Sequence, residues 1–381
     1  MKNSIRVIAA LSLASSPLLV NAEGLERINI NPSFMFNEGG SAEISFASIN
    51  PSLPATEGAL FDLTEGLDVA PSFSAVSLSV KTSLGDNLDL GLFYTDNGNG
   101  VLIDWGTIPA ATSAGATVDW EISADLEMPT IAALAKYKIN ENMSVFGGLK
   151  RVTVKDGAFV KTGGDTNPND VDTRINDAPH WVLSEKSELG AIYGAAYEMP
   201  EIALRVSLMF EDGIELEIPT TAEGGLTAAD GTSEAGVGDA ITLNFQSGIA
   251  EDTLLFGSIR RSNWEDYQVK VPVPGPALRT LSEFENGTSY NLGVGRKISD
   301  DLSLSLSAFY DGGDGADASE LAPTGANRSI SLGGKYSVSE NADLSLGASY
   351  SKRGDATTGS IGATLEDSTV LTIGSRLSFN F

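Results

Sequence analysis

The chain has 381 residues, no cysteine, and 51 acidic against 24 basic residues, which give a formal net charge of −27. The absence of cysteine excludes a disulfide framework and a thiolate metal site, and so acidic a chain lacks the basic footprint of a nucleic-acid-binding protein. Beyond the amino terminus, no apolar run approaches the roughly 18 residues of a membrane-spanning helix. The 41 glycines favour short strands and turns over helices.

The amino terminus has the pattern of a secretory signal peptide. Lys2 and Arg6 precede a mostly apolar stretch over 7–20, and the small residue Ala22 follows it. A basic start, an apolar segment and small residues before a cleavage point are typical of exported proteins. We expect cleavage after Ala22, so that residues 1–22 are removed and the rest of the chain is exported.

The segment 23–40 comes next and does not alternate between polar and apolar residues. It is apolar in its middle, at Phe34, Met35 and Phe36. From residue 41 onward the pattern changes.

Apolar and polar residues alternate with period two from residue 41 to the end, which predicts strands with one apolar and one polar face. Tight polar turns alternate with long links rich in Gly, Asp, Thr and Pro. This alternation of short turns with long links, together with an even number of strands, is typical of outer-membrane barrels. A propeller or a sandwich would not be expected to show it. About fourteen strands are predicted, near 41–50, 71–82, 87–96, 121–139, 142–156, 183–198, 201–217, 237–250, 253–268, 285–298, 301–311, 327–338, 342–353 and 367–381.

The last predicted strand supports a closed barrel. Leu371, Ile373, Leu377, Phe379 and Phe381 occupy alternate positions up to the carboxyl terminus. As a free edge such a flat apolar strand would promote aggregation, whereas closure pairs it with the first strand. We therefore predict an all-β fold, a closed antiparallel transmembrane β-barrel over 41–381.

Aromatic residues near the predicted strand ends suggest two girdles at the membrane interfaces. These residues are Tyr94, Tyr137, Tyr197, Tyr267, Tyr290, Tyr310, Tyr336, Tyr350, Trp120, Trp181 and Trp264.

The alternation also assigns faces to the strands. A basic side chain on the lipid face would cost about 2–4 kcal/mol at the midplane, so the register should turn such residues inward. In 253–268 the pattern leaves open whether Arg260 or Arg261 points inward. Elsewhere the inward positions include Lys136, Arg205, Ser207, Met209, Lys297, Lys335 and Arg376, with Ser303, Ser305 and Ser307 opposite the outward Leu302, Leu304 and Leu306.

No pattern in the sequence predicts an enzyme. His180 is the single histidine, and beside Trp181 it is typical of an interfacial ring rather than of a catalytic base. The runs Asp165–Asp172 and Asp311–Asp317 resemble calcium loops but lack the full spacing with a distal glutamate. We expect solvated acidic loops without a metal site, cofactor or catalytic residue, and leave open whether divalent ions link these loops to lipid head groups.

The segment 23–40 is the part of the chain that a simple pore would not need. A barrel of about fourteen strands has a lumen that leaks unless something fills it. We expect the segment to fold inward as a hatch; a disordered periplasmic tail is the alternative.

The beginning of the mature chain resembles the FadL/TodX family of outer-membrane transporters. The resemblance rests on Glu26-Arg27, Pro32-Ser33, Phe36 and Glu38-Gly39, followed directly by Ala42–Pro51. It implies a fourteen-stranded barrel with an amino-terminal hatch that carries long-chain fatty acids or other hydrophobic compounds. It also implies release of ligand by hatch movement and a sideways passage at a kinked strand.

The resemblance extends to the gating element of the hatch. Asn31, Pro32 and Ser33 are similar to an Asn-Pro-Ala element of the family, with serine in place of alanine. They are the predicted gating residues.

The predicted function is passive transport of hydrophobic compounds, most of all long-chain fatty acids, across the outer membrane of a Gram-negative bacterium. A fatty acid needs an apolar slot and one or two cations for its carboxylate. We expect the partners to be hydrophobic small molecules and outer-membrane lipids, with a monomeric barrel and both termini in the periplasm. The predicted ligand residues are Phe34, Met35, Phe36, Lys136, Arg205, Met209, Lys297, Lys335 and Arg376.

Two alternatives remain open. Each basic residue could instead pair with a lumen carboxylate such as Glu198 or Glu211. The whole protein could instead be a general or anion-preferring diffusion porin for small polar solutes.

Overall fold

A computed structural model describes residues 24–58, 67–111, 117–164, 179–223, 227–313, 318–359 and 361–381. The predicted signal peptide, the run Asp165–Asp172 and positions 314–317 of the second acidic run lie outside the described residues.

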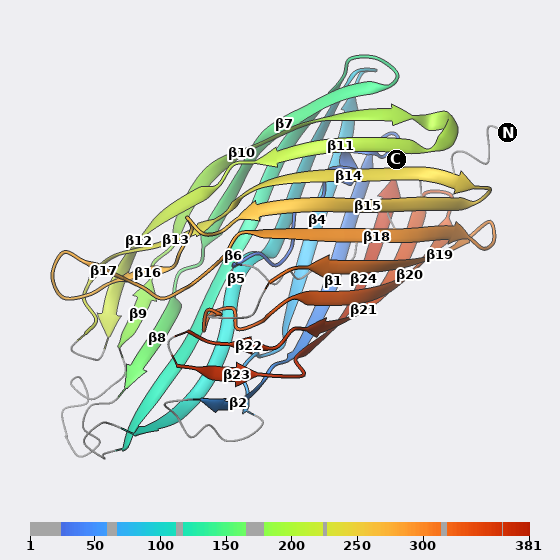
Figure 1. The fold of residues 1–381 in the computed structure, drawn as a ribbon. Coiled ribbons are helices and arrows are strands. Elements are labelled where there is room, and N and C mark those ends of the chain that lie inside the picture. Colours follow the sequence, from blue (N-terminus) through green and yellow to red (C-terminus); the bar gives the residue numbers. More distant parts are fainter. Residues whose placement is uncertain are drawn as a thin grey trace.

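Fourteen long antiparallel strands form a closed barrel (Figure 1). Each strand pairs with its neighbour along the chain, and the last pairs with the first from Ser41 opposite Asn380 to Ser52 opposite Thr369. Gly40 and Phe381 exchange two backbone hydrogen bonds of 2.9 Å just beyond this ladder. The barrel strands are β1 (Ser41–Ser52), β4 (Phe73–Leu84), β5 (Leu88–Ala111), β6 (Thr117–Lys138), β7 (Met143–Val154), β10 (Lys186–Met199), β11 (Leu204–Glu211), β14 (Asp239–Ala250), β15 (Thr253–Asn263), β18 (Gly287–Lys297), β19 (Leu302–Asp311), β20 (Asn327–Ser339), β21 (Ala342–Arg353) and β24 (Thr369–Asn380).

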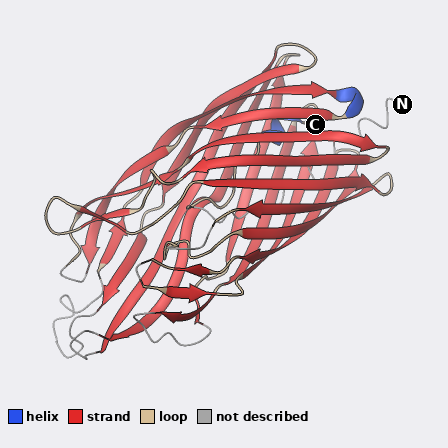
Figure 2. Ribbon diagram, viewed as in Figure 1, coloured by secondary structure: helices blue, strands red, loops and turns tan. Residues whose placement is uncertain are grey.

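Short strands gather at the end of the barrel opposite the labelled carboxyl terminus, at the left of Figure 1. Four of them form a separate small sheet, and the others extend the wall of the barrel. Figure 2 shows how strands dominate the fold, with two short 3-10 helices, η1 (Pro32–Phe36) and η2 (Pro200–Ile202). The short strands are β2 (Pro54–Gly58), β3 (Leu67–Asp68), β22 (Ala356–Thr357) and β23 (Ala363–Leu365) in the small sheet, and β8 (Ala158–Gly164), β9 (His180–Leu183), β12 (Ile214–Glu223), β13 (Gly231–Val237), β16 (Lys270–Pro272) and β17 (Leu278–Thr280) on the wall.

Two predicted strands were wrong in their extent. β5 was predicted to end near residue 96 but continues to Ala111. The sequence predicts a single strand over 201–217, but β11 ends at Glu211 and β12 begins at Ile214 to pair with β9 and β13 instead. The break falls at Gly213, where a Cβ atom would lie 1.9 Å from the Tyr267 hydroxyl oxygen. The missing side chain of Gly213 therefore leaves room for the Tyr267 ring where the strand is interrupted.

The predicted faces are confirmed along the barrel. On β19, Leu306 is 48% exposed on the outside, whereas Ser305 is 7% exposed on the inside. The same rule holds on β11, where Leu208 faces out and Met209 is buried. On β15 it is Arg260 that points inward, because its side chain is 8% exposed and ion-paired in the interior.

The long connections form a cap with its own apolar core. Trp181 and Trp264, predicted at the membrane interface, are instead buried in this core, and the structure describes Trp120 by its backbone alone. His180 is half-buried against the ring of Phe159, and burial lowers the pKa of its imidazole. Tyr137, Tyr197, Tyr290, Tyr310, Tyr336 and Tyr350 are exposed, as an interfacial girdle requires. The prediction was wrong for Tyr267, which packs against the core of the cap.

The described part of the chain contains no helix that is long and apolar enough to cross a membrane.

The face assignment predicts unequal effects of one arginine at two adjacent positions. Leu306→Arg should lower the free energy of unfolding by roughly 2–4 kcal/mol, because the cation enters the lipid face. Ser305→Arg should lower it less, because the cation remains in the polar interior. Urea unfolding of the protein in phospholipid vesicles measures both values, and equal losses would contradict the assignment.

Candidate functional site

The segment Gly24–Gly40 runs through the barrel interior from the cap to the opposite end. At the cap end, Leu25 is buried in the apolar core of the cap and its carbonyl accepts a 2.7 Å hydrogen bond from the Gly100 amide. At the other end, the Lys81 ammonium donates to the carbonyls of Asn37 at 2.5 Å and Gly39 at 2.8 Å. The segment is therefore held at both ends by the barrel wall.

The middle of the segment forms the 3-10 helix η1 because its sequence favours this turn. The Asn31 side chain caps the turn by accepting a 2.9 Å hydrogen bond from the Ser33 amide, and Pro32 stands at the first helical position. The predicted gating residues thus start η1. Its three large apolar side chains, Phe34, Met35 and Phe36, are buried.

These side chains pack on one apolar wall of the lumen. Gly91 leaves room for this contact, since a Cβ atom there would lie 2.1 Å from the Met35 sulfur. The wall comes from β5, β6, β7, β10 and β11, and its residues are Phe93, Ala132, Leu134, Phe146, Ile192, Ala196 and Met209.

The opposite wall of the lumen is covered with hydroxyl and amide groups. It is built by β18, β19, β20 and β21, where small polar residues take the inward positions. Those residues include Ser289, Asn291, Ser303, Ser305, Ser307, Ser329, Ser345 and Ser351.

A cavity of about 200 Å³ separates η1 from part of this polar surface. The segment contributes Ile30, Phe34 and Phe36, and three guanidinium groups reach the cavity, from Arg205, Arg260 and Arg376. The volume of the cavity is below the range of about 300–1,000 Å³ that pockets for drug-sized ligands usually hold.

The first ion-pair network lies near the cap end of the segment. Arg260 donates from Nε and Nη2 to the two carboxylate oxygens of Glu26, and from Nη1 to Glu211. Nη1 also donates to the Thr242 hydroxyl at 2.8 Å, and Lys150 lies 3.3 Å from Glu211. Four charged groups from the segment and three barrel strands thus meet away from solvent.

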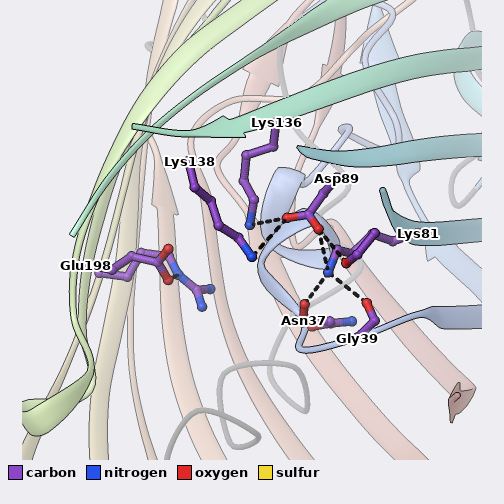
Figure 3. Close-up of polar contacts among 9 residues, drawn as sticks. Asn37, Gly39, Lys81, Asp89, Lys136, Lys138 and Glu198 are labelled. Carbon is purple, nitrogen blue, oxygen red and sulfur yellow. Dashed lines mark hydrogen bonds and ion pairs between the residues drawn. The ribbon is translucent and has the colours of Figure 1, made fainter. Parts of the chain in front are cut away.

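The second network lies at the other end of the segment (Figure 3). Asp89, whose side chain is 1% exposed, lies 3.4 Å from Lys81 and 3.1 Å from Lys136, with Lys138 at 3.9 Å. Because Lys81 also binds the Asn37 and Gly39 carbonyls, Asp89 fixes the cation that holds the end of the segment.

The ring of Phe36, which belongs to the segment, lies next to a cation of this network. The Lys136 ammonium lies 4.5 Å and the Arg205 guanidinium 4.4 Å from the ring centroid, distances that allow cation–π attraction. Arg205 in turn pairs with Glu198 at 2.9 Å.

β5 is kinked where it passes the segment. Its pairing with β6 shifts between Thr95 and Asn99, and Asp96 and Asn97 instead bond through their side chains to the backbone of β4. Gly98 accepts hydrogen bonds from the Arg27 and Ile28 amides, so the segment lies directly against the kink.

The structure brings most of the predicted ligand residues together. Phe34, Met35 and Phe36 belong to η1, and Lys136, Arg205 and Met209 lie around it. Arg376 reaches the cavity. Lys297 and Lys335 lie elsewhere, paired with Asp300 and Asp343.

Sequence reasoning missed five charged residues of the two networks, Glu26, Lys81, Asp89, Lys138 and Lys150. Lys81 and Asp89 occupy inward positions of alternating strands, so the sequence pattern could have indicated these two residues. Nothing in the non-alternating segment indicated that Glu26 would meet Arg260.

Asp89→Asn should loosen the end of the segment that Lys81 holds. Breaking a buried ion pair by removing one partner costs about 3–5 kcal/mol, and here Lys81 and Lys136 both lose their carboxylate. We expect higher ion conductance in planar bilayers and faster proteolysis of the segment. Asp343→Asn, which breaks the pair with Lys335 away from the segment, should leave conductance unchanged; wild-type behaviour of Asp89→Asn would contradict the anchoring role.

Comparison with known proteins gives the same architecture. No family model matches the chain, and no curated protein matches its sequence. Among solved structures, the toluene transporter TodX of P. putida is similar with a TM-score of 0.67, 16% identity and 92% of each chain covered. A FadL homologue of Pseudomonas aeruginosa has a TM-score of 0.66, with 14% identity over 98% of each chain.

A third structure, the toluene transporter TbuX of Ralstonia pickettii, has a TM-score of 0.62 and 11% identity, covering 95% of this chain and 100% of that one. At such identities the likeness concerns the fold. The predicted resemblance is therefore confirmed at that level: the chain has the barrel fold of the FadL/TodX transporters.

Proposed function

We propose that the protein is a passive transporter for hydrophobic compounds in the outer membrane of a Gram-negative bacterium, with both termini in the periplasm. The observation that carries this proposal is the aromatic helix η1, which covers the apolar wall of the lumen and borders a cavity. A pore for polar solutes has no need of a buried apolar surface inside its lumen. Three structures of the same fold are those of toluene transporters and a FadL homologue, which supports the proposal.

The chemistry of the residues that line the cavity favours long-chain fatty acids as the substrate class. Ile30, Phe34 and Phe36 offer an apolar side, while Arg205 and Arg260 offer guanidinium groups that bind carboxylates in a bidentate manner. A bare hydrocarbon would form no ion pair with these cations. An amphiphile with one carboxylate matches both sides of the cavity.

Ligand release requires movement of the hatch, the segment up to Gly40. The cavity is below the usual volume of pockets for drug-sized ligands, and the hatch occupies the adjoining space. We infer that the hatch withdraws and that ligand leaves sideways at the kink of β5. At Asp96 and Asn97 side chains replace part of the ladder between β4 and β5, so the wall is easier to open there than along a continuous ladder.

The polar wall favours a second function, diffusion of small polar solutes. Ser303, Ser305 and Ser307 with their neighbours give half of the lumen a hydrophilic surface. Under this alternative the hatch would leave a conducting path beside it.

Deletion of residues 24–39 separates the two functions. If the hatch closes the lumen, single-channel conductance in planar bilayers is small for the intact protein and rises strongly after deletion. Uptake of radiolabelled palmitate by whole cells should fall, because the apolar side of the cavity is lost. A conductance that is already large and is unchanged by deletion would refute the transporter and favour the porin.

A disulfide between β4 and β5 tests the lateral route. Ser74→Cys combined with Asn97→Cys joins positions that the Asn97 side chain already bridges at 3.2 Å, and the chain contains no other cysteine. Oxidation should reduce palmitate uptake at least about tenfold, and reduction should restore it, because the strands can no longer separate.

The matched control is Ser331→Cys with Ser349→Cys, which joins β20 and β21 at a 3.0 Å hydroxyl contact. It should leave uptake unchanged. Full uptake through the oxidised β4–β5 pair would exclude the kink as the exit.

A further inference from the structure

We propose that Arg260 is the carboxylate-binding site of the transporter and that Glu26 of the hatch occupies it until a substrate carboxylate takes its place. The inference rests on the proposed function and adds to it the residue that recognises the head group and the event that releases the hatch.

The geometry at Arg260 is that of a carboxylate-binding site already filled. Nε donates to one oxygen of Glu26 at 3.2 Å, and Nη2 donates to the other. Two parallel donors to two oxygens form the bidentate arrangement by which arginine recognises carboxylates. Glu26 therefore occupies the position that a fatty-acid head group would take.

The charges at this site balance only while a carboxylate stays bound. Glu26 and Glu211 carry two negative charges, and Arg260 and Lys150 carry two positive charges. Withdrawal of Glu26 would leave one excess positive charge among buried groups, which is costly. A substrate carboxylate that enters as Glu26 leaves restores the balance, so exchange is favoured over simple dissociation.

The site is accessible from the ligand cavity. Arg260, Thr242 and Phe34 all line that cavity, so an amphiphile with its chain along η1 can bring its head group toward Arg260. The other two guanidinium groups pair with carboxylates of the wall, Arg205 with Glu198 and Arg376 with Glu43. Neither pair includes a carboxylate of the hatch, so exchange there would not release a charged anchor of the hatch.

Exchange at Arg260 would act directly on the kink of β5. Glu26 forms a β-bridge with Asn99, and the next residue, Arg27, donates from its guanidinium to the Asn97 side chain at 2.6 Å. Loss of the Glu26 anchor therefore weakens the part of the hatch that holds the kink. Head-group binding and the sideways exit are thereby linked through two adjacent residues.

Glu26→Gln tests the exchange with palmitate and hexadecanol as paired probes, which share a chain length and differ in the carboxylate. Calorimetric titration of the folded protein in detergent should show at least a tenfold gain in palmitate affinity, because Gln no longer competes for Arg260 as a charged group. Hexadecanol affinity should stay within about twofold of wild type.

Two further variants serve as controls for this experiment. Glu198→Gln removes a wall carboxylate from Arg205 and should give no comparable gain for palmitate. Arg260→Lys keeps the charge but loses the bidentate fork, so palmitate affinity should fall while hexadecanol binding persists. An unchanged or reduced palmitate affinity of Glu26→Gln, or an equal gain with Glu198→Gln, would overturn the assignment.

Movement of the hatch gives an independent readout. Asn31→Cys places a single spin label on the hatch in a chain without other cysteines. Palmitate should raise the mobility of the label, hexadecanol should not, and in Glu26→Gln the label should be mobile without ligand. If both probes bind and move the label equally, the exchange is refuted and the transporter stands; if neither probe binds the wild-type protein, the proposed function itself fails.

Discussion

Barrel closure is the constraint on which the rest of this structure depends. Inside a membrane each backbone amide and carbonyl needs a hydrogen-bond partner within the protein. The ladder between β1 and β24 supplies these partners for the first and last strands of the barrel. Closing fourteen strands leaves an interior too wide for side chains alone to fill. The residues Gly24–Gly40 occupy part of that interior, and the chemistry of the lumen follows from how they are held there.

The lumen is divided into two chemical halves, and the hatch matches one of them. Phe34, Met35 and Phe36 cover the apolar half, so their contacts are dry and close-packed. Ionic networks hold the two ends, through Arg260 near the cap and Lys81 at the other end. Apolar packing in the middle and buried ion pairs at the two ends together fix the position of the hatch.

Much of the barrel follows from period-two alternation alone, because each inward position is fixed once a strand is in register. The burial of Met209 and Lys136 could be predicted in this way. The break between β11 and β12 could not, since it depends on the contact of Gly213 with the distant Tyr267. The burial of Trp181 could not either, because the packing of long connections leaves no periodic signal.

The ion-pair partners were the hardest part of the site to foresee. Glu26 and Arg260 are 234 positions apart, and alternation alone did not decide between Arg260 and Arg261. Basic residues at inward positions can be identified from the sequence. Which carboxylate each one pairs with depends on how the closed barrel brings distant strands together. For the same reason, Lys297 and Lys335 satisfied the pattern and yet lie apart from the cavity.

The two hydrogen bonds between Gly40 and Phe381 have a consequence for biogenesis. The hatch leaves the barrel at the point where the last residue of the chain docks, and a Cβ atom on Gly40 would lie 2.4 Å from the ring of Phe381. Docking of the last strand during folding thus completes the attachment that Lys81 provides at this end of the hatch. The seam that closes the barrel and the exit of the hatch share the same backbone contacts, so closure of the barrel and fixing of the hatch are coupled.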